Sequence, residues 1–289
     1  MRDEVRQIQQ LLEEQIYIAD PAIATALYLS MALGKPLLIE GPAGVGKTEI
    51  AKALAGALNT KLIRLQCYEG LDATTALYEW NYPKQLLYLK LEEMSPVSEA
   101  EKEAAIFSEP FLLKRPLLQA ISEPERSPVL LIDEVDRSDE EFEAFLLEVL
   151  SDFQVTIPEI GTIKATHRPH VVLTSNRSRD LSDALRRRCL YHWIDYPSLE
   201  KELEIVRAKV PEISNELSQR LTQIMQATRT MSLSKIPGVA ETLDWANALV
   251  ALQATGLDDE IMAETLGCFL KDETDIASFK AELPRINPD

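Results

Sequence analysis

The stretch Gly41–Thr48, which reads GPAGVGKT, decides the fold of this chain. It satisfies the pattern G-x-x-x-x-G-K-[ST], whose glycines let successive backbone N–H groups curve around an anion while the next helix adds its dipole. In such a loop Lys47 reaches the β- and γ-phosphates of a nucleotide, and the Thr48 hydroxyl is a ligand of Mg²⁺. The predicted nucleotide-binding residues are therefore Gly41, Pro42, Ala43, Gly44, Val45, Gly46, Lys47 and Thr48.

The segments on either side of this loop support the assignment. Residues 36–40 (PLLIE) are a short apolar run that predicts a strand. From Thr48 onward, apolar residues recur at helical spacing, which predicts a helix; they are Ile50, Ala51, Leu54, Ala55 and Leu58. Strand, glycine loop and helix thus follow one another in the order that a P-loop needs. A chance glycine-rich turn would not require this order.

Four further apolar runs predict strands, at residues 61–66, 128–132, 170–174 and 190–195. They are apolar on both faces rather than alternating, which is typical of a parallel sheet covered by helices on each side. Helices are predicted around Val5, Ile8 and Leu12, over 20–33 with Asp20 as N-cap, and over 139–150 with Ser138 and Glu141 as a capping pair.

The pattern changes after Pro197. Residues 198–289 contain only helical periodicity, with helices predicted at 199–210, 215–228, 239–254 and 258–270. The predicted fold class is α/β, a five-stranded parallel P-loop sheet flanked by helices and followed by a small all-helical lid. The predicted domains are residues 1–197 and 198–289.

Two acids follow the strand at residues 128–132. Such a strand would deliver Asp133 to the Mg²⁺ shell and place Glu134 where it can polarise an attacking water. An apolar strand that ends in Asp-Glu is common by itself, but downstream of a complete P-loop it is the expected second half of the site. Asn176 closes the next strand and could orient the water, although an Asn after a strand is usually a turn residue.

Three consecutive arginines, Arg186, Arg187 and Arg188, end a short helix just before the last predicted strand. Positive charge at a helix C-terminus is favourable and accounts for one or two of them. The alternative is an arginine finger that reaches the γ-phosphate in a neighbouring subunit.

These motifs in this order resemble an AAA+ ATPase over nearly the whole chain. Matched residue by residue, the resemblance implies Walker A roles for Lys47 and Thr48, Walker B roles for Asp133 and Glu134, and a sensor 1 role for Asn176. Arg188 stands directly before Cys189, as the finger does in that family, and Arg187 is second in line. ATP and Mg²⁺ are the implied cofactors.

Within the AAA+ class, the chain is similar to the MoxR family. The hairpin-like stretch at residues 153–167 lies where that clade has an insertion, and residues 71–89 lie at a second insertion. The block at residues 168–197 and the lid segment KIPGVAETLDWA (residues 235–246) are similar to the subgroup linked to carbon monoxide dehydrogenase maturation. The resemblance implies a chaperone-like hexameric ring that works with a von Willebrand factor A (VWA) domain protein to mature a client, such as a metalloenzyme.

One region departs from the pattern of that family, and the role of a second region is open. The lid position where relatives carry a sensor 2 arginine falls near Ala240, and Lys235 is the only nearby cation in the sequence. In the insertion at residues 71–89, Tyr78, Trp80 and Tyr82 are spaced as on one face of a strand, so packing in the core and contact with a client are both open.

The net charge is −17, which disfavours a protein that grips phosphate backbones over its surface. A nucleic-acid motor is therefore the weaker alternative, and a nucleotide-dependent switch or scaffold is another. No apolar run approaches the roughly 20 residues that span a bilayer, and the charged start does not fit a secretory signal. A cytoplasmic location without a transmembrane segment is expected.

Overall fold

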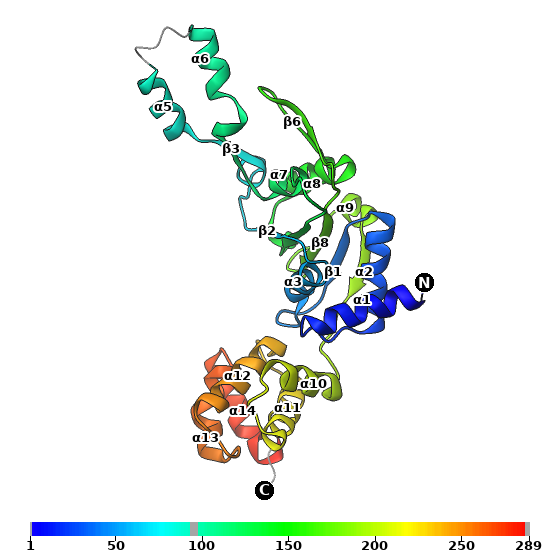
Figure 1. The fold of residues 1–289 in the computed structure, drawn as a ribbon. Coiled ribbons are helices and arrows are strands. Elements are labelled where there is room, and N and C mark those ends of the chain that lie inside the picture. Colours follow the sequence, from blue (N-terminus) through cyan, green and yellow to red (C-terminus); the bar gives the residue numbers. More distant parts are fainter. Residues whose placement is uncertain (1, 93–97, 287–289) are drawn as a thin grey trace.

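The computed structural model describes residues 2–92 and 98–286. Its centre is a five-stranded sheet in the order β2-β5-β8-β1-β9, and every neighbouring pair is parallel (Figure 1). The strands are β1 (Leu37–Glu40), β2 (Leu62–Gln66), β5 (Val129–Asp133), β8 (His170–Ser175) and β9 (Leu190–Trp193). The five strands predicted from the sequence are the five strands of this sheet. The predicted fold class is confirmed.

Alternating residues of the strands face two separate apolar cores. Leu37, Ile39 and Leu131 pack with α1 (Arg2–Glu14), α2 (Pro21–Leu33) and α3 (Lys47–Ala57) on one face. Leu38 and Leu130 pack with α7 (Pro116–Ile121), α8 (Glu140–Asp152) and α9 (Asp183–Arg188) on the other. Helices therefore cover both faces, as a parallel sheet requires.

The edge strands differ from the prediction. β1, β5 and β8 are buried on both faces apart from the start of β8, but β2 and β9 each have alternate residues that reach solvent. On β9, Tyr191 is 52% exposed and Trp193 is 41% exposed. The expectation of strands apolar on both faces was wrong for these two, because a strand at the margin of a sheet lacks cover on part of its surface.

Two helix starts also differ in detail. The N-cap of α8 is Asp139, whose carboxylate accepts from the backbone N–H of Phe142 at 2.8 Å, so the predicted pair of Ser138 and Glu141 was wrong. The Ser138 hydroxyl donates to the Val135 carbonyl instead. Asp20 stands at the N-cap of α2, but its side chain makes no capping bond and pairs with Lys201 of the helical region.

An arm projects away from the central sheet (Figure 1). It contains α4 (Ala73–Leu77), β3 (Tyr78–Trp80), α5 (Tyr82–Leu91), α6 (Glu99–Ile106), a 3₁₀ turn (Glu109–Phe111) and β4 (Leu112–Lys114), which pairs antiparallel with β3. Trp80 is buried, with its ring centroid 5.3 Å from that of Phe107, so it belongs to a core. Tyr82 is not on the strand; it starts α5 and is exposed.

The predicted insertion at residues 153–167 is a hairpin. β6 (Gln154–Ile157) pairs antiparallel with β7 (Gly161–Lys164), and Gly161 has a positive φ of 100° at its turn. The hairpin projects from the same side of the molecule as the arm (Figure 1).

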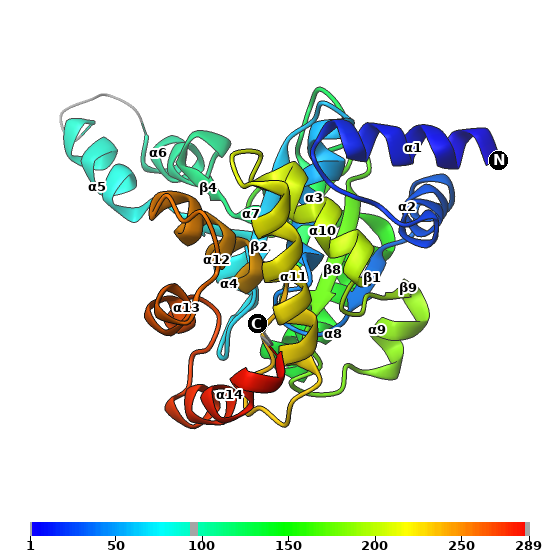
Figure 2. The ribbon, with the colours of Figure 1, turned by 90° about the horizontal axis from the view of Figure 1, so that it is seen from below.

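The C-terminal part is all helical and has its own core. It consists of α10 (Leu199–Lys209), α11 (Asn215–Arg229), α12 (Val239–Ala251), α13 (Asp259–Thr265), a 3₁₀ turn (Leu266–Cys268) and α14 (Glu273–Ile286) (Figure 2). Trp245, Phe269 and Phe279 are fully or almost fully buried in this core. α14 was not predicted, and the helix predicted over 258–270 is shorter. The boundary after Pro197 stays a prediction, which the separate core supports. None of the helices within the described ranges is long and apolar enough to span a bilayer.

Candidate nucleotide-binding site

The P-loop runs from the end of β1 to the start of α3, and its glycines are required by close approach. A Cβ on Gly41 would lie 2.0 Å from the carbonyl oxygen of Ile194, so no side chain fits there. Gly44 and Gly46 have φ angles of 74° and 92°, in the left-handed region that favours glycine. The backbone therefore curves back on itself before α3 begins at Lys47, which leaves a concave loop at the helix N-terminus.

Lys47 lies inside this loop rather than in solvent. Its Nζ donates to the carbonyl oxygens of Gly41 at 2.8 Å and Pro42 at 2.5 Å, and the residue is only 7% exposed. Burial lowers the pKa of Lys47 to about 8, against an opposing effect of the nearby carboxylates, chiefly Asp136 and Asp133. A partly dehydrated ammonium group held by carbonyls is well placed to bind a phosphate.

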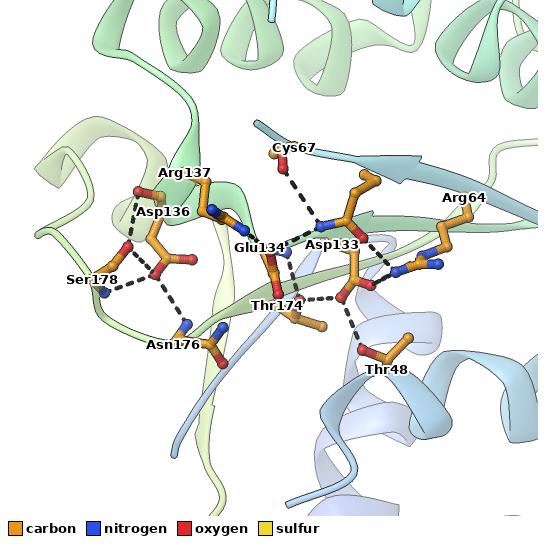
Figure 3. Close-up of polar contacts among 11 residues, drawn as sticks. Thr48, Arg64, Cys67, Asp133, Glu134, Asp136, Arg137, Thr174, Asn176 and Ser178 are labelled. Carbon is orange, nitrogen blue, oxygen red and sulfur yellow. Dashed lines mark hydrogen bonds and ion pairs between the residues drawn. The ribbon is translucent and has the colours of Figure 1, made fainter. Parts of the chain in front are cut away.

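Asp133 is buried at the end of β5 and accepts several hydrogen bonds (Figure 3). Its Oδ1 accepts from the hydroxyls of Thr48 at 3.0 Å and Thr174 at 2.6 Å, and its Oδ2 accepts from Arg64. A carboxylate beside a hydroxyl at the phosphate loop is the hard oxygen donor set that Mg²⁺ prefers, and Mg²⁺ takes its remaining ligands from water and phosphate. Thr48 and Asp133 therefore fit a magnesium ion.

Glu134 has a left-handed backbone, with φ 54° and ψ 50°. Such a conformation costs a non-glycine residue on the order of 1–3 kcal/mol and persists where surrounding contacts fix it. Here the backbone N–H of Glu134 donates to Thr174 Oγ1 at 2.9 Å, while its carboxylate accepts from Gln66 Nε2 at 3.0 Å and Arg137 Nη1 at 3.2 Å (Figure 3). The strained turn directs the Glu134 side chain away from the strand axis and toward Gln66.

Asn176 follows β8 and lines the same cleft as the P-loop. The loop that carries it is fixed by Asp136, whose Oδ2 accepts from the backbone N–H groups of Asn176 at 3.2 Å and Ser178 at 2.8 Å, and from the Ser178 hydroxyl at 2.7 Å (Figure 3). The position of Asn176 is thereby tied to the turn that holds Glu134.

The cleft has a volume of about 540 Å³ and lies between the sheet and the helical region. Ile16, Tyr17 and Ile18 line one end. The other lining residues come from the P-loop, the start of α3, the ends of β5 and β8, the segment after β9 and the helical region; they include Lys47, Thr48, Asp133, Glu134, Asn176, Ile194, Ile205, Ala240 and Leu243. The predicted Walker A, Walker B and sensor 1 residues thus converge on one cleft.

The helical region touches the P-loop directly. The backbone N–H of Ala240 donates to the Gly44 carbonyl at 3.1 Å, and a Cβ on Gly238 would lie 2.7 Å from Gly44 Cα. Ala240, the predicted sensor 2 position, lines the cleft, whereas the backbone N–H of Lys235 donates to Asp275. Two lysines of α10, Lys201 and Lys209, line the cleft instead.

Among the described residues that line this cleft, there is none of the three arginines of α9. Arg186 pairs with the fully buried Glu40 at 3.1 Å, and Arg188 donates to the Leu147 carbonyl at the end of α8. Arg187 is exposed, and its side chain has no hydrogen bond or ion pair with the described residues. In its own chain, Arg188 is not brought to the phosphate side of the cleft.

Several residues of this site were not predicted. They are Arg64 and Gln66 on β2, Thr174 on β8, and Asp136 with Ser178. The polar pair at alternate positions at the end of a strand, Arg64 and Gln66, was a usable signal, because residues two apart point to the same face.

Comparisons with known proteins agree with this geometry. Residues 37–194 match the AAA family, the ATPase family associated with various cellular activities. An uncharacterized protein of Staphylococcus haemolyticus is 24% identical over 77% of this chain and 79% of its own length. The chaperone protein ClpB 1 of Synechocystis is 26% identical over 78% of this chain, and ClpB 2 of Parasynechococcus marenigrum is 32% identical over 48% of it. The matches span only 23% and 13% of those two chaperones.

Solved structures show the same fold. A point mutant of RuvB from Thermotoga maritima superposes with a TM-score of 0.51 at 18% identity, covering 99% of this chain and 79% of that one. A candidate ATPase from Cytophaga hutchinsonii superposes with a TM-score of 0.50 at 15% identity, covering 99% of this chain and 93% of its own. With its P-loop, its Asp-Glu strand and a family match over more than half its length, this chain belongs to the AAA family of ATPases.

Proposed function

We propose that this ATPase uses Mg²⁺-ATP in the cleft described above and remodels a partner protein. The observation that carries the ATP site is the convergence of Thr48, Asp133, Glu134 and Asn176 on the cleft that the P-loop lines. Lys47 would leave the carbonyls of its own loop and bind the β- and γ-phosphates. Thr48 and Asp133 would hold Mg²⁺, which neutralises charge on the phosphates when it is bound.

The catalytic roles follow from the side chains present. Glu134 would accept a proton from the attacking water, for which its carboxylate has to turn away from Gln66 and Arg137. Asn176 would orient the same water through its amide, and Asp136 keeps the loop of Asn176 in place. Glu134 and Asn176 would both act on the water through a polar group. A substitution that keeps the size of the side chain but changes that group therefore tests each role separately.

We further propose that the active form is a ring, most simply a hexamer, in which Arg188 reaches the γ-phosphate of the neighbouring subunit. The arginines of α9 lie outside their own cleft, so an α9 arginine at the γ-phosphate would have to come from a neighbouring subunit. Light scattering with and without a non-hydrolysable ATP analogue tests this proposal. A monomer at high protein concentration with the analogue present would argue against the ring.

For the substrate, we propose a MoxR-type chaperone that acts with a VWA-domain protein on a client such as a metalloenzyme. The similarity to ClpB chaperones and the projecting hairpin at β6 and β7 support a protein substrate. The net charge of −17 argues against nucleic acid as the substrate. Co-purification from the native host, with the Glu134→Gln protein as the trap, tests it; recovery of nucleic acid in place of a protein would overturn it.

A nucleotide-dependent switch is the second candidate. The Glu134 carboxylate is held by Gln66 and Arg137, and the sensor 2 position is Ala240, so the described site favours slow turnover until something releases Glu134. Steady-state phosphate release decides between the two. A rate that stays low with the client and VWA protein present favours the switch.

A further inference from the structure

Glu40, the last residue of β1, carries a fully buried carboxylate immediately before the P-loop. Its backbone carbonyl accepts from the N–H of Ile194 at 2.8 Å, and the next residue, Gly41, packs against the carbonyl of the same Ile194. Burying a carboxylate is costly unless the group is paired, so the side chain that pairs with Glu40 is informative.

Arg186 of α9 is the partner of this carboxylate. Its Nη2 donates to Glu40 Oε1 at 3.1 Å. Two residues later, Arg188 donates to the Leu147 carbonyl and to the Ser151 hydroxyl at the end of α8. Two arginine side chains therefore hold the last turn of α9, one against β1 and the other against α8.

These two contacts differ in what the proposed ring requires of them. Arg188 has to leave the Leu147 carbonyl before it can reach a nucleotide in a neighbouring subunit. The contact between Arg186 and Glu40 is not broken by that change, because it uses a different side chain. Breaking it would leave an unpaired buried charge, which is strongly unfavourable. Glu40 would therefore keep α9 in place while Arg188 extends.

The second oxygen of Glu40 lies near the loop that follows Asn176. Glu40 Oε2 accepts no hydrogen bond from the described residues, and Arg177 Nε is 3.8 Å away, beyond hydrogen-bond distance. Arg177 directly follows Asn176, and its guanidinium carbon lies 5.8 Å from the centroid of the Trp193 ring. The P-loop, the loop of Asn176 and α9 thus meet at Glu40, and the hydrogen bond of its carboxylate is to α9.

Resting on the proposed ring, we propose that Glu40 is a positioning residue for the site of the neighbouring subunit. Through Arg186 it fixes α9 in the orientation from which Arg188 meets the γ-phosphate across the interface. Glu40 lies beside the P-loop of its own chain, yet its effect on hydrolysis is exerted on the nucleotide of the next subunit.

Glu40→Gln keeps the size of the side chain and removes the charge that holds Arg186. ATP affinity, measured by calorimetric titration of the full chain, should be unchanged because the P-loop residues are intact. Hydrolysis should fall about 10- to 10²-fold, since a small misplacement of a catalytic group has an effect of that size. Hydrolysis at the wild-type rate would overturn the proposal.

The decisive measurement mixes Glu40→Gln subunits with Glu134→Gln subunits. The first kind keeps Glu134 and can receive Arg188 from the second kind, whose Glu40 is intact. Random assortment in a head-to-tail ring forms this pairing at about a quarter of the interfaces, so hydrolysis should partly recover. If Glu40 acts on its own P-loop instead, every subunit able to hydrolyse ATP still carries the defect. No recovery, in rings shown to exchange subunits, would then overturn the proposal.

Two further variants control for stability. Glu123→Gln changes another buried acid, which pairs with Lys61 and does not line the cleft, and it should leave hydrolysis unchanged. Should Glu40→Gln not fold, Glu40→Asp keeps the charge but withdraws the carboxylate from Arg186. The same loss of hydrolysis, with recovery on mixing, then supports the proposal, and a loss without recovery or no loss at all overturns it.

Mixing Arg188→Ala with Glu134→Gln subunits separates this inference from the proposed function. If that pair recovers hydrolysis and the Glu40→Gln pair does not, only the role of Glu40 is overturned. If neither pair recovers, the shared site of the proposed ring is overturned, and the role of Glu40 with it.

Discussion

The carboxyl edge of the central sheet and helix α9 represent two kinds of candidate site residue. At the sheet edge, Asp133 accepts hydrogen bonds from both Thr48 and Thr174 of the same chain, and all three residues line the cleft. On α9, Arg186 and Arg188 bind other groups of their own chain, and Arg187 extends into solvent. The comparison teaches that the residues proposed to bind nucleotide meet within one chain, whereas an α9 arginine could act on the nucleotide only in the proposed ring, from a neighbouring subunit.

The largest effect should come from the arginine. Arg188→Ala should leave ATP affinity nearly intact and lower hydrolysis by about 10³-fold or more, since a finger stabilises charge that develops only during phosphoryl transfer. Hydrolysis should partly recover when Arg188→Ala subunits are mixed with Glu134→Gln subunits, because some interfaces then pair an intact Glu134 with an intact Arg188.

The control for this experiment is Arg207→Ala, an exposed arginine on α10. If no activity returns in rings shown to exchange subunits, Arg188 only stabilises the end of α8 through the Leu147 carbonyl. The same mixing experiment with Arg187→Ala then tests the arginine that the structure leaves unpaired among the described residues.

Glu134→Gln tests the half of the site that one chain completes. Hydrolysis should fall by about 10²- to 10⁴-fold because an amide cannot accept the proton of the water. Binding of Mg²⁺-ATP should persist, since Thr48 and Asp133 are unchanged. Phosphate release and calorimetric titration measure the two quantities, with Glu141→Gln on the exposed surface of α8 as the control. Near-normal turnover would assign the base to another residue.

Lys47→Ala should abolish high-affinity nucleotide binding while the fold persists. The ammonium group contacts loop carbonyls and no apolar core, and loss of charge-assisted hydrogen bonds to phosphate should weaken affinity about 10²-fold. Calorimetric titration measures the affinity, and circular dichroism the fold. Lys52→Ala changes another lysine of α3, one that pairs with Glu49 on the surface, and should have no effect. Unchanged affinity in Lys47→Ala would overturn the P-loop assignment.

The smallest effect concerns pH. The pKa of Lys47 is lowered to about 8 in the free protein, and a bound phosphate raises it again because it favours the charged form. Above pH 8 the free lysine is increasingly neutral, so binding takes up a proton and affinity should fall, by up to about tenfold per pH unit. Titrations in buffers of different ionisation enthalpy measure this uptake. Affinity that stays flat from pH 8 to about 9.5 would contradict it.

The difference between the two regions also marks how far the sequence could be interpreted. The P-loop, Asp133, Glu134 and Asn176 were predictable because each follows a strand, and parallel strands end at one edge of the sheet. Arg64 and Gln66 could have been noticed as a polar pair on one strand, but their contacts with Asp133 and Glu134 could not be predicted. Those contacts depend on the register that sets Gln66 opposite Asp133, and no local pattern encodes a register between strands so far apart in the chain. The prediction of Ser138 as the cap of α8 was wrong because Asp139, one residue later, is the N-cap.

Gly44 and Gly238 make the contact between the P-loop and the lid a close one. The two segments meet backbone against backbone, and the Ala240 N–H bonded to the Gly44 carbonyl adds a short directional link. No rotatable side chain lies between these two glycines to absorb a displacement. A shift of the P-loop toward the lid would therefore have to displace the start of α12 as well, so that the loop and the lid would move as one piece at this contact.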